Sequence, residues 1–301
     1  MKKKLIFLYF STFKKQERDF ALLETISHTH SSRVTKIKNI KTAEVYVLKE
    51  TRIAERGKQE RRALKKLEHR NIVKVLFTGH LKVDREVRSG TVMEYGHTSL
   101  YNAIINEKLQ DKIKEKRKEK RKEILLQILE AVSYIHSKEV AHGSLVAKNI
   151  LIDPEGMAVK ICGFGDSVCR DGPDSTPEEM EEGYAKDVLS VGRLMVFICI
   201  GERILKNGFL CLVKEKQLKE LLCSQNPRNA SLGGNNMADA YMKLEDEVGK
   251  DGIDLIGGLY KVGRKERIGF AEVMAHPFFH RNKRAKTAGQ LGARPVRRQN
   301  E

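Results

Sequence analysis

The amino-acid sequence predicts an α+β fold with two lobes, a small strand-rich lobe over about residues 20–95 and a larger helical lobe over about residues 96–280. Two observations lead to this prediction. Partly alternating runs rich in β-branched residues, separated by polar turns, dominate before Gly96, whereas long apolar-rich helical patterns dominate after it. Strands and helices grouped in this way are typical of an α+β domain rather than of a doubly wound parallel sheet.

The elements follow from these patterns in chain order. Strands are expected at 20–28, 32–40, 43–50, 73–81 and 90–96, with one helix at 52–73 between the third and fourth strands. In that helix Glu60, Leu64 and Leu67 recur at i, i+4 and i+7, so they share one face. The second lobe is expected to contain helices at 122–137, 186–205, 251–262 and 270–279.

The charge of the chain is strongly positive but unevenly placed. Its 301 residues include 57 Lys and Arg against 40 Asp and Glu, a formal net charge of +17 at pH 7. The excess lies in a basic N-terminal segment (1–19), a basic helical insertion (108–122) and a basic C-terminal tail (281–301). Solvated charge is the favoured interpretation, and contact of the tail with RNA or an acidic partner is the alternative.

Composition excludes several classes of protein. A hydrophobic content of 40% excludes wholesale disorder, and no run approaches the roughly 18 apolar residues that a membrane span needs. The five cysteines are odd in number and contain no C-x-x-C pair, which indicates reduced thiols. We therefore expect an intracellular protein with protein partners, in the cytoplasm or alternatively in the nucleus.

Several motifs occur in a fixed order along the chain. They are the catalytic-loop-like His142-Gly-Ser-Leu-Val-Ala-Lys-Asn149, Lys160-Ile-Cys-Gly-Phe-Gly165, Asp187-Val-Leu-Ser-Val-Gly192, and Arg267 followed by the run Phe270–Phe279. Together they resemble the eukaryotic protein-kinase domain over about residues 20–280. The resemblance implies a bilobal protein-kinase-like fold that transfers phosphate from ATP with the help of Mg²⁺.

Several parts of the kinase site match this sequence. Lys49 corresponds to the strand lysine that faces phosphate, and Glu60 to the helix glutamate that pairs with it, so an ion pair is expected. The apolar residues that connect the lobes correspond to Leu64, His142 and Phe164. The residues expected to surround the adenine are Ile26, Val34 and Val47 above, Leu151 below, and Met93, Glu94 and Tyr95 along the hinge.

The loop that should cover the phosphates departs from the family pattern. Ser27, Thr29 and Ser32 stand at the three glycine positions, and each adds a Cβ where close backbone approach is wanted. Their hydroxyls could hydrogen-bond a phosphate, but an ordinary β-turn is the favoured interpretation. We therefore expect a degraded phosphate loop.

The catalytic and metal positions depart further. Ser144 stands at the position of the catalytic aspartate, and a serine hydroxyl is not a general base near neutral pH. Gly143 replaces the arginine that usually receives an activation-loop phosphate. Gly163 stands at the position of the metal-binding aspartate, which leaves Asn149 as the one remaining ligand by position, so Mg²⁺ binding is doubtful. Recruiting Asp166 instead would require a shifted loop.

The segment that follows is short. Ten residues separate Gly165 from Thr176-Pro-Glu178, which resembles the A-P-E motif, so little peptide-docking surface is expected. Ser167, Ser175 and Thr176 are candidate phosphoacceptors, with turn formation as the favoured role. Lys148 resembles the basic residue of tyrosine-kinase-like loops and could contact a phosphate.

Three hypotheses follow. The first is a pseudokinase that acts as a conformational scaffold or regulator and binds ATP weakly, with little dependence on Mg²⁺. The second is an active or residual protein kinase, supported by Lys49, Glu60 and Asn149. The third is an assembly scaffold similar to the kinase-like domains of stress-sensor endoribonucleases and ribonuclease L; residues 279–301 are too short for a nuclease module, so nuclease activity is not expected.

Overall fold

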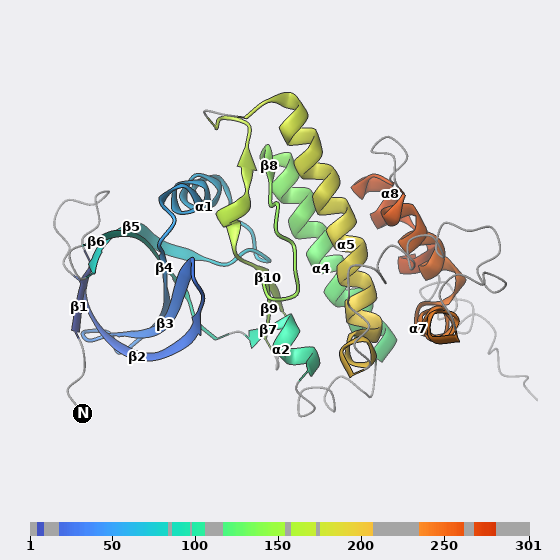
Figure 1. Cartoon of the computed structure of the whole chain (residues 1–301), viewed down its shortest axis with the longest axis horizontal. Helices are drawn as coiled ribbons and strands as arrows, with labels where there is room; N and C mark the ends of the chain where they lie inside the picture. The colour runs from blue at the N-terminus through green and yellow to red at the C-terminus, as the bar shows by residue number, and fades with distance from the viewer. Residues whose placement is uncertain are drawn as a thin grey trace, which may run out of the picture. The chain divides into compact units, whose positions relative to one another are not determined.

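The computed structural model describes residues 5–8, 18–83, 86–96, 98–105, 117–153, 158–172, 175–206, 235–261 and 268–280. The basic tail, residues 108–116 of the predicted insertion, and Arg267 lie outside this described part. The chain divides into two compact units, residues 1–194 and 195–301. The predicted α+β class is confirmed, with a β-sheet at the start of the first unit and helices after it (Figure 1).

The first unit begins with a six-stranded antiparallel sheet in the order β1-β2-β3-β4-β6-β5. Its strands are β1 (Leu5–Leu8), β2 (Arg18–His28), β3 (Ser32–Asn39), β4 (Val45–Thr51), β5 (Val75–Val83) and β6 (Glu86–Glu94). The sheet is curled, so that its edge strands β1 and β5 contact each other (Figure 1). Strand β1 lies within the segment read from the sequence only as basic, because a four-residue strand leaves little periodic signal.

One face of this sheet forms a small apolar core. Phe20, Ile37, Leu48 and Val92 come from four different strands and are fully or almost fully buried together. Alternation along each strand directs these residues to one face and their neighbours to the other, which carries Lys49. The core therefore fixes the register that positions the functional face.

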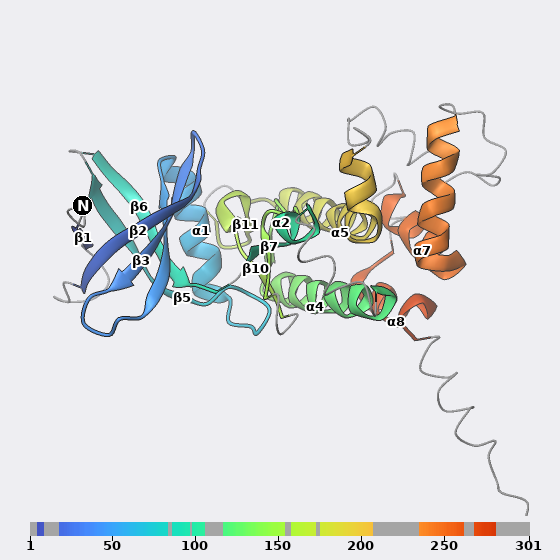
Figure 2. The same ribbon diagram turned by 90° about the horizontal axis from the view of Figure 1, so that it is seen from below.

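Helix α1 (Ala54–Lys66) follows β4 and contacts β4 and β6 as well as the segment after residue 163 (Figure 2). The sequence predicted this helix to continue to residue 73, but it ends at Lys66, because Leu67 takes an extended conformation (φ −112°, ψ 118°). Leu67 remains buried at 9% exposure, so its hydrophobic role is kept outside the helix. The turn after it leads directly to β5.

The remaining described elements of the first unit are helices and five short strands. They are β7 (Thr98–Ser99), α2 (Leu100–Ile105), α4 (Arg117–Ser137), β8 (Val140–Ala141), β9 (Ile150–Ile152), β10 (Val159–Ile161), η1 (Phe164–Asp166), β11 (Val168–Cys169) and the first part of α5 (Pro177–Lys206). The short strands pair as β10-β9-β7 and β11-β8. Strands β8 and β9 flank the loop 142–149, and β10 and β11 flank the segment 162–167, which contacts α1 through η1.

The second unit contains the end of α5, α7 (Asn235–Tyr260) and α8 (Phe270–Ala275). Helix α7 is interrupted at Gly249, whose φ of +70° breaks the helical geometry. In α8 and the turn after it, Val273, Phe278 and Phe279 are buried. Among the helices of the described residues, none combines the length and apolarity required to cross a bilayer.

Candidate functional site

The ion pair expected between Lys49 and Glu60 is present. The Lys49 Nζ lies 2.7 Å from Oε1 of Glu60, and the side chains are 16% and 2% exposed. Strand β4 supplies the lysine and α1 supplies the glutamate. Both side chains are largely buried, so separating the lysine from the glutamate would leave an uncompensated charge away from water. The ion pair is therefore expected to stay formed.

Of the three residues predicted to lie above an adenine, Val34 and Val47 share one face of the sheet, and Ile26 lies at a register irregularity in β2. Val34 is paired with Lys49 across β3 and β4, and Val47 is paired with Met93 across β4 and β6. Val34 and Val47 are half-buried and Met93 is 7% exposed, whereas Ile26 is 51% exposed at the end of β2. Leu151, the residue expected below the ring, lies half-buried on β9.

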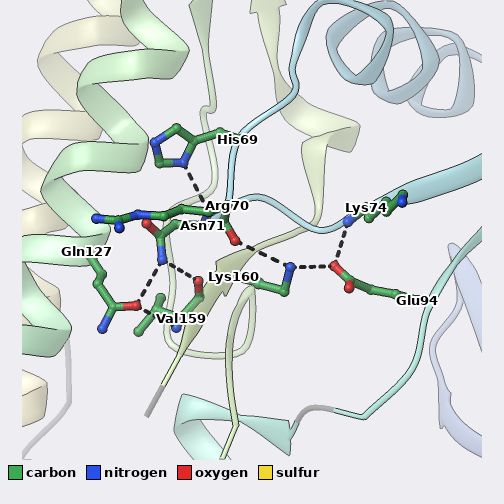
Figure 3. Close-up of polar contacts among 8 residues, drawn as sticks. All are labelled: His69, Arg70, Asn71, Lys74, Glu94, Gln127, Val159 and Lys160. Carbon is green, nitrogen blue, oxygen red and sulfur yellow. Dashed lines mark hydrogen bonds and ion pairs between the residues drawn. The ribbon is translucent and has the colours of Figure 1, made fainter. Parts of the chain in front are cut away.

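The predicted hinge residue Glu94 is part of a polar network between strand β10 and the turn after α1 (Figure 3). Its Oε1 accepts a hydrogen bond from the Lys74 backbone N–H at 2.7 Å and lies 2.8 Å from Lys160 Nζ. Lys160 also donates to the Arg70 carbonyl at 3.3 Å. The Glu94 side chain is therefore held by protein groups, and the predicted role of Glu94 along the hinge stays a prediction.

This network continues into α4. The Asn71 Nδ2 donates to Gln127 Oε1 at 2.9 Å and to the Val159 carbonyl at 2.8 Å, and the Val159 N–H donates to the same Gln127 oxygen (Figure 3). These bonds join the turn after α1 to both α4 and β10. The sequence interpretation did not identify these contacts, because their partners are far apart in the chain.

A second feature missed from the sequence lies at the hinge end of the slot. The Lys36 Nζ lies 4.4 Å from the centre of the Tyr95 ring and 3.3 Å from Glu24 Oε1. Contact with Tyr95 first, and with Glu24 second, raises the pKa of Lys36. Lys36 is paired with Val47 across the strands and follows Val34 by two residues, so strand alternation was the available signal.

The predicted phosphate loop forms the tip of the β2–β3 hairpin. The Thr29 N–H donates to the Ser32 carbonyl at 2.8 Å, and the Ser32 N–H donates to Thr29 Oγ1 at 3.1 Å. Ser27 lies within β2, opposite Val34. The hydroxyls at the tip therefore bond within the turn, in agreement with the turn interpretation.

The catalytic-loop segment is held from below by the buried Asp187 of α5. Its two carboxylate oxygens accept hydrogen bonds from the His142 N–H at 2.7 Å and the Gly143 N–H at 2.9 Å. His136 Nε2 of α4 lies 2.9 Å from the same carboxylate. Three groups therefore converge on one buried acid, which fixes the backbone of this loop.

His142 and Phe164 form the expected apolar contact below α1. Their ring centres are 4.5 Å apart, and both residues are fully buried. Burial lowers the pKa of His142, which keeps its ring neutral. Its Nε2 lies 3.0 Å from the Cys162 carbonyl. Leu64, the third residue expected in this contact, is 9% exposed on α1, which packs against η1.

Ser144 and Asn149 contact each other. The Asn149 Nδ2 donates to the Ser144 carbonyl at 2.8 Å and lies 3.4 Å from the Ser144 hydroxyl. The side-chain amide of Asn149 is therefore used within the loop. The neighbouring Lys148 has its Nζ 5.1 Å from the centre of the Tyr101 ring of α2.

Gly163 lies directly against Asn149 and has a left-handed backbone, with φ +85°. A Cβ at residue 163 would lie 2.6 Å from Asn149 Cγ and 2.7 Å from Oδ1. A side chain at this position could therefore be accommodated only if the Asn149 amide moved. Burial also raises the pKa of the preceding Cys162 to about 12, so its thiol stays protonated.

The residues at the expected metal position offer few ligands for Mg²⁺. Mg²⁺ prefers several oxygen ligands in an octahedron, and at the expected position the described residues provide one amide oxygen and no carboxylate. No group of three or more potential ligands among His, Cys, Asp and Glu occurs in the described part of the chain. Asp166, the alternative ligand, pairs instead with Arg56 of α1 at 2.7 Å.

The candidate phosphoacceptors take different positions. Ser167 is 2% exposed, whereas Thr176 is exposed at the start of α5. The Glu179 N–H donates to Thr176 Oγ1 at 3.2 Å, and the Thr176 N–H donates to Glu179 Oε2 at 3.1 Å. These two reciprocal bonds form a capping box at the start of α5. Thr176 therefore has a local structural role, as the sequence interpretation favoured.

The curled sheet, the Lys49–Glu60 pair and the anchored 142–149 loop together form the arrangement expected of a bilobal α+β kinase fold. The model of the protein kinase domain family matches residues 20–279, and the chain belongs to this family.

Among characterised proteins, the chain is similar to protein kinase gsk3 of Schizosaccharomyces pombe, with 24% identity over 261 residues (77% of this chain and 66% of the relative). It is also similar to the serine/threonine-protein kinase par-4 of Caenorhabditis briggsae, with 27% identity over 242 residues (74% and 33%). The putative sperm motility kinase W of Mus musculus is 29% identical over 231 residues (68% and 44%). The matched region thus spans between a third and two thirds of these relatives.

Proposed function

We propose that this chain is a catalytically impaired protein kinase that acts through its conformation and its binding partners. The observation that supports this most directly is the contact between Gly163 and Asn149. The Asn149 amide occupies the space that a side chain at residue 163 would need, and it is itself bonded to Ser144. The position of the base and the position of the metal ligand thus hold no carboxylate, and at residue 163 this arrangement leaves no room for one.

The same site retains groups that suit a nucleotide. Lys49 would face the phosphates, while Val34, Val47 and Leu151 would contact the base on its two faces. Lys36 stands over the Tyr95 ring at the hinge end, where a purine would enter. With a turn in place of the glycine loop and one amide in place of a metal site, ATP binding would be weak and nearly independent of Mg²⁺.

Thermal shift with ATP tests this proposal directly. The melting temperature of the purified chain should rise slightly with ATP, by the same amount in Mg²⁺ and in chelator, because a ligand that binds only the folded state stabilises it by RT ln(1 + [L]/Kd). The Lys49→Met variant should lose most of this shift. A rise that depends strongly on Mg²⁺ would contradict the proposal.

A residual protein kinase is the second candidate, favoured by the intact Lys49–Glu60 pair. Radiolabel from ATP appearing on the chain or on an added protein, and disappearing with Lys49→Met, would establish this candidate. Loss of the base and the metal ligand each removes several kcal/mol of transition-state stabilisation, so we expect no incorporation above background.

A further inference from the structure

A group of basic side chains lies at the tip of the β2–β3 hairpin, on the face of the sheet opposite Lys49. Val34 is paired with Lys49 across β3 and β4, and the adjacent pair on these strands is Arg33 with Glu50. Successive side chains of a strand point to opposite faces, so Arg33 and Glu50 share the face that carries the apolar core. The group is therefore separate from the face on which a nucleotide is proposed to bind.

The charge of Arg33 is not neutralised by an ion pair. Glu50, the acid opposite it, has a side chain only 6% exposed and pairs with Arg88 at 3.5 Å. Arg33 itself is half-buried, and its side chain has no ion pair or hydrogen bond with any residue in the described part of the chain. Its guanidinium group therefore has N–H donors available for a ligand.

Arg52 brings a second guanidinium group to the same place. It is exposed, and it donates to His28 Nε2 at 2.9 Å and to the His30 carbonyl at 3.4 Å, so both of these acceptors are uncharged. His28 is the cross-strand partner of Arg33, so its imidazole lies beside one arginine and accepts a bond from the other. Because Nε2 accepts this bond, Nδ1 of His28 carries a proton and is a further donor.

We infer that Arg33, Arg52 and His28 bind a phosphorylated serine or threonine of a partner protein. A phosphate monoester has three acceptor oxygens and close to two negative charges, which match two guanidinium groups without a carboxylate partner and one imidazole N–H. Nucleic acids are bound through several cations spaced along the phosphate backbone, whereas this group is one compact site. The inference rests on the proposed role as a binding protein and names its class of partner.

Fluorescence anisotropy on the full chain at physiological salt tests the inference. The labelled probes are Ala-Ala-phosphothreonine-Ala-Ala, its unphosphorylated counterpart, and a counterpart with glutamate in place of phosphothreonine. The phosphopeptide should bind at least about fivefold more tightly than either counterpart, and Arg33→Gln or Arg52→Gln should each weaken it about two- to fivefold, as expected for a partly exposed ion pair. Equal affinity for the glutamate peptide, or unchanged affinity in both variants, would overturn the inference.

A matched control is available on the same hairpin strand. Lys38 lies in β3 and Lys41 in the turn after it, both are exposed, and both are away from the hairpin tip. The pair Lys38→Gln with Lys41→Gln removes the same charge as Arg33→Gln with Arg52→Gln and should leave phosphopeptide binding unchanged. Equal weakening in the two double variants would show general attraction to a chain of net charge +17 and would overturn the inference.

Two further measurements separate this site from folding and from nucleic-acid binding. Because Arg33 has no side-chain partner among the described residues, Arg33→Gln should leave the melting temperature unchanged while weakening the phosphopeptide. A labelled RNA octamer that Arg33→Gln weakens more than it weakens the phosphopeptide would make the group a nucleic-acid contact and overturn the inference. These readouts do not use phosphotransfer, so detecting kinase activity would refute the proposed function without altering their result.

Discussion

Introducing an aspartate at residue 163 should destabilise the chain instead of restoring a metal ligand. Gly163 has φ +85°, and its Cβ position lies 2.6 Å from Asn149 Cγ. An aspartate in the left-handed region costs about 1 kcal/mol, the low end of the range for residues other than glycine. Moving the Asn149 amide breaks its 2.8 Å bond to the Ser144 carbonyl, worth about 1 kcal/mol.

The expected total for Gly163→Asp is therefore about 2 kcal/mol, which in a domain of this size lowers the melting temperature by about 4–8 °C. Urea unfolding and calorimetry of the purified variant would measure it. In an Asn149→Ala background the obstacle is absent, so the same substitution should cost only the backbone part, about 1 kcal/mol.

Two outcomes would refute this reasoning. An equal cost in both backgrounds would show that Asn149 is not the obstacle. A Gly163→Asp variant as stable as the parent, with an ATP thermal shift that now requires Mg²⁺, would show that the site accepts a metal ligand without rearrangement.

Three further predictions concern the groups around this site. Lys49→Met leaves the buried Glu60 carboxylate without its partner and should cost about 3–5 kcal/mol in urea unfolding, whereas the further change Glu60→Gln should recover part of the loss. Asp187→Ala removes the acceptor of two backbone N–H groups, at His142 and Gly143, and should cost about 2–5 kcal/mol, visible as faster amide hydrogen exchange in that loop. Because burial lowers the pKa of His142, the unfolded chain takes up a proton at a higher pH than the folded chain does. The free energy of unfolding should therefore be full above about pH 6.5 and fall by at most about 1.4 kcal/mol per pH unit below it. A series of melting temperatures against pH in which His142→Phe has the same slope as the parent would contradict this.

Local patterns in the sequence predicted the helices and strands well where the hydrophobic periodicity was strong. The strand-rich and helical parts, the Lys49–Glu60 pair and the His142–Phe164 contact were all expected and are all present. Boundaries were less predictable. The helix expected to reach residue 73 ends at Lys66, and α5 runs unbroken from Pro177 to Lys206, although its start and its Asp187 motif were read as separate features.

The parts of the site that could not be predicted depend on contacts between distant residues. Strand alternation could place Lys36 on the face that carries Val34, but the contact of Lys36 with Tyr95 depends on strand register, which no local pattern determines. The position of the Asn149 amide against Gly163 depends on the conformation of two loops at once. The engagement of Glu94 by Lys160 requires that β6 and β10 be brought together by the tertiary structure.

The anchoring of the 142–149 loop by Asp187 has a consequence for how such chains are recognised. The acid that sets the loop's shape lies 45 residues further along the chain from His142, while the residue that would decide its chemistry, Ser144, takes no part in that anchorage. The shape of this loop and its reactivity thus depend on different residues. Membership of the protein kinase family therefore indicates that a chain has the fold. Whether the chain can catalyse phosphate transfer depends on a single side chain, the one at the position of Ser144.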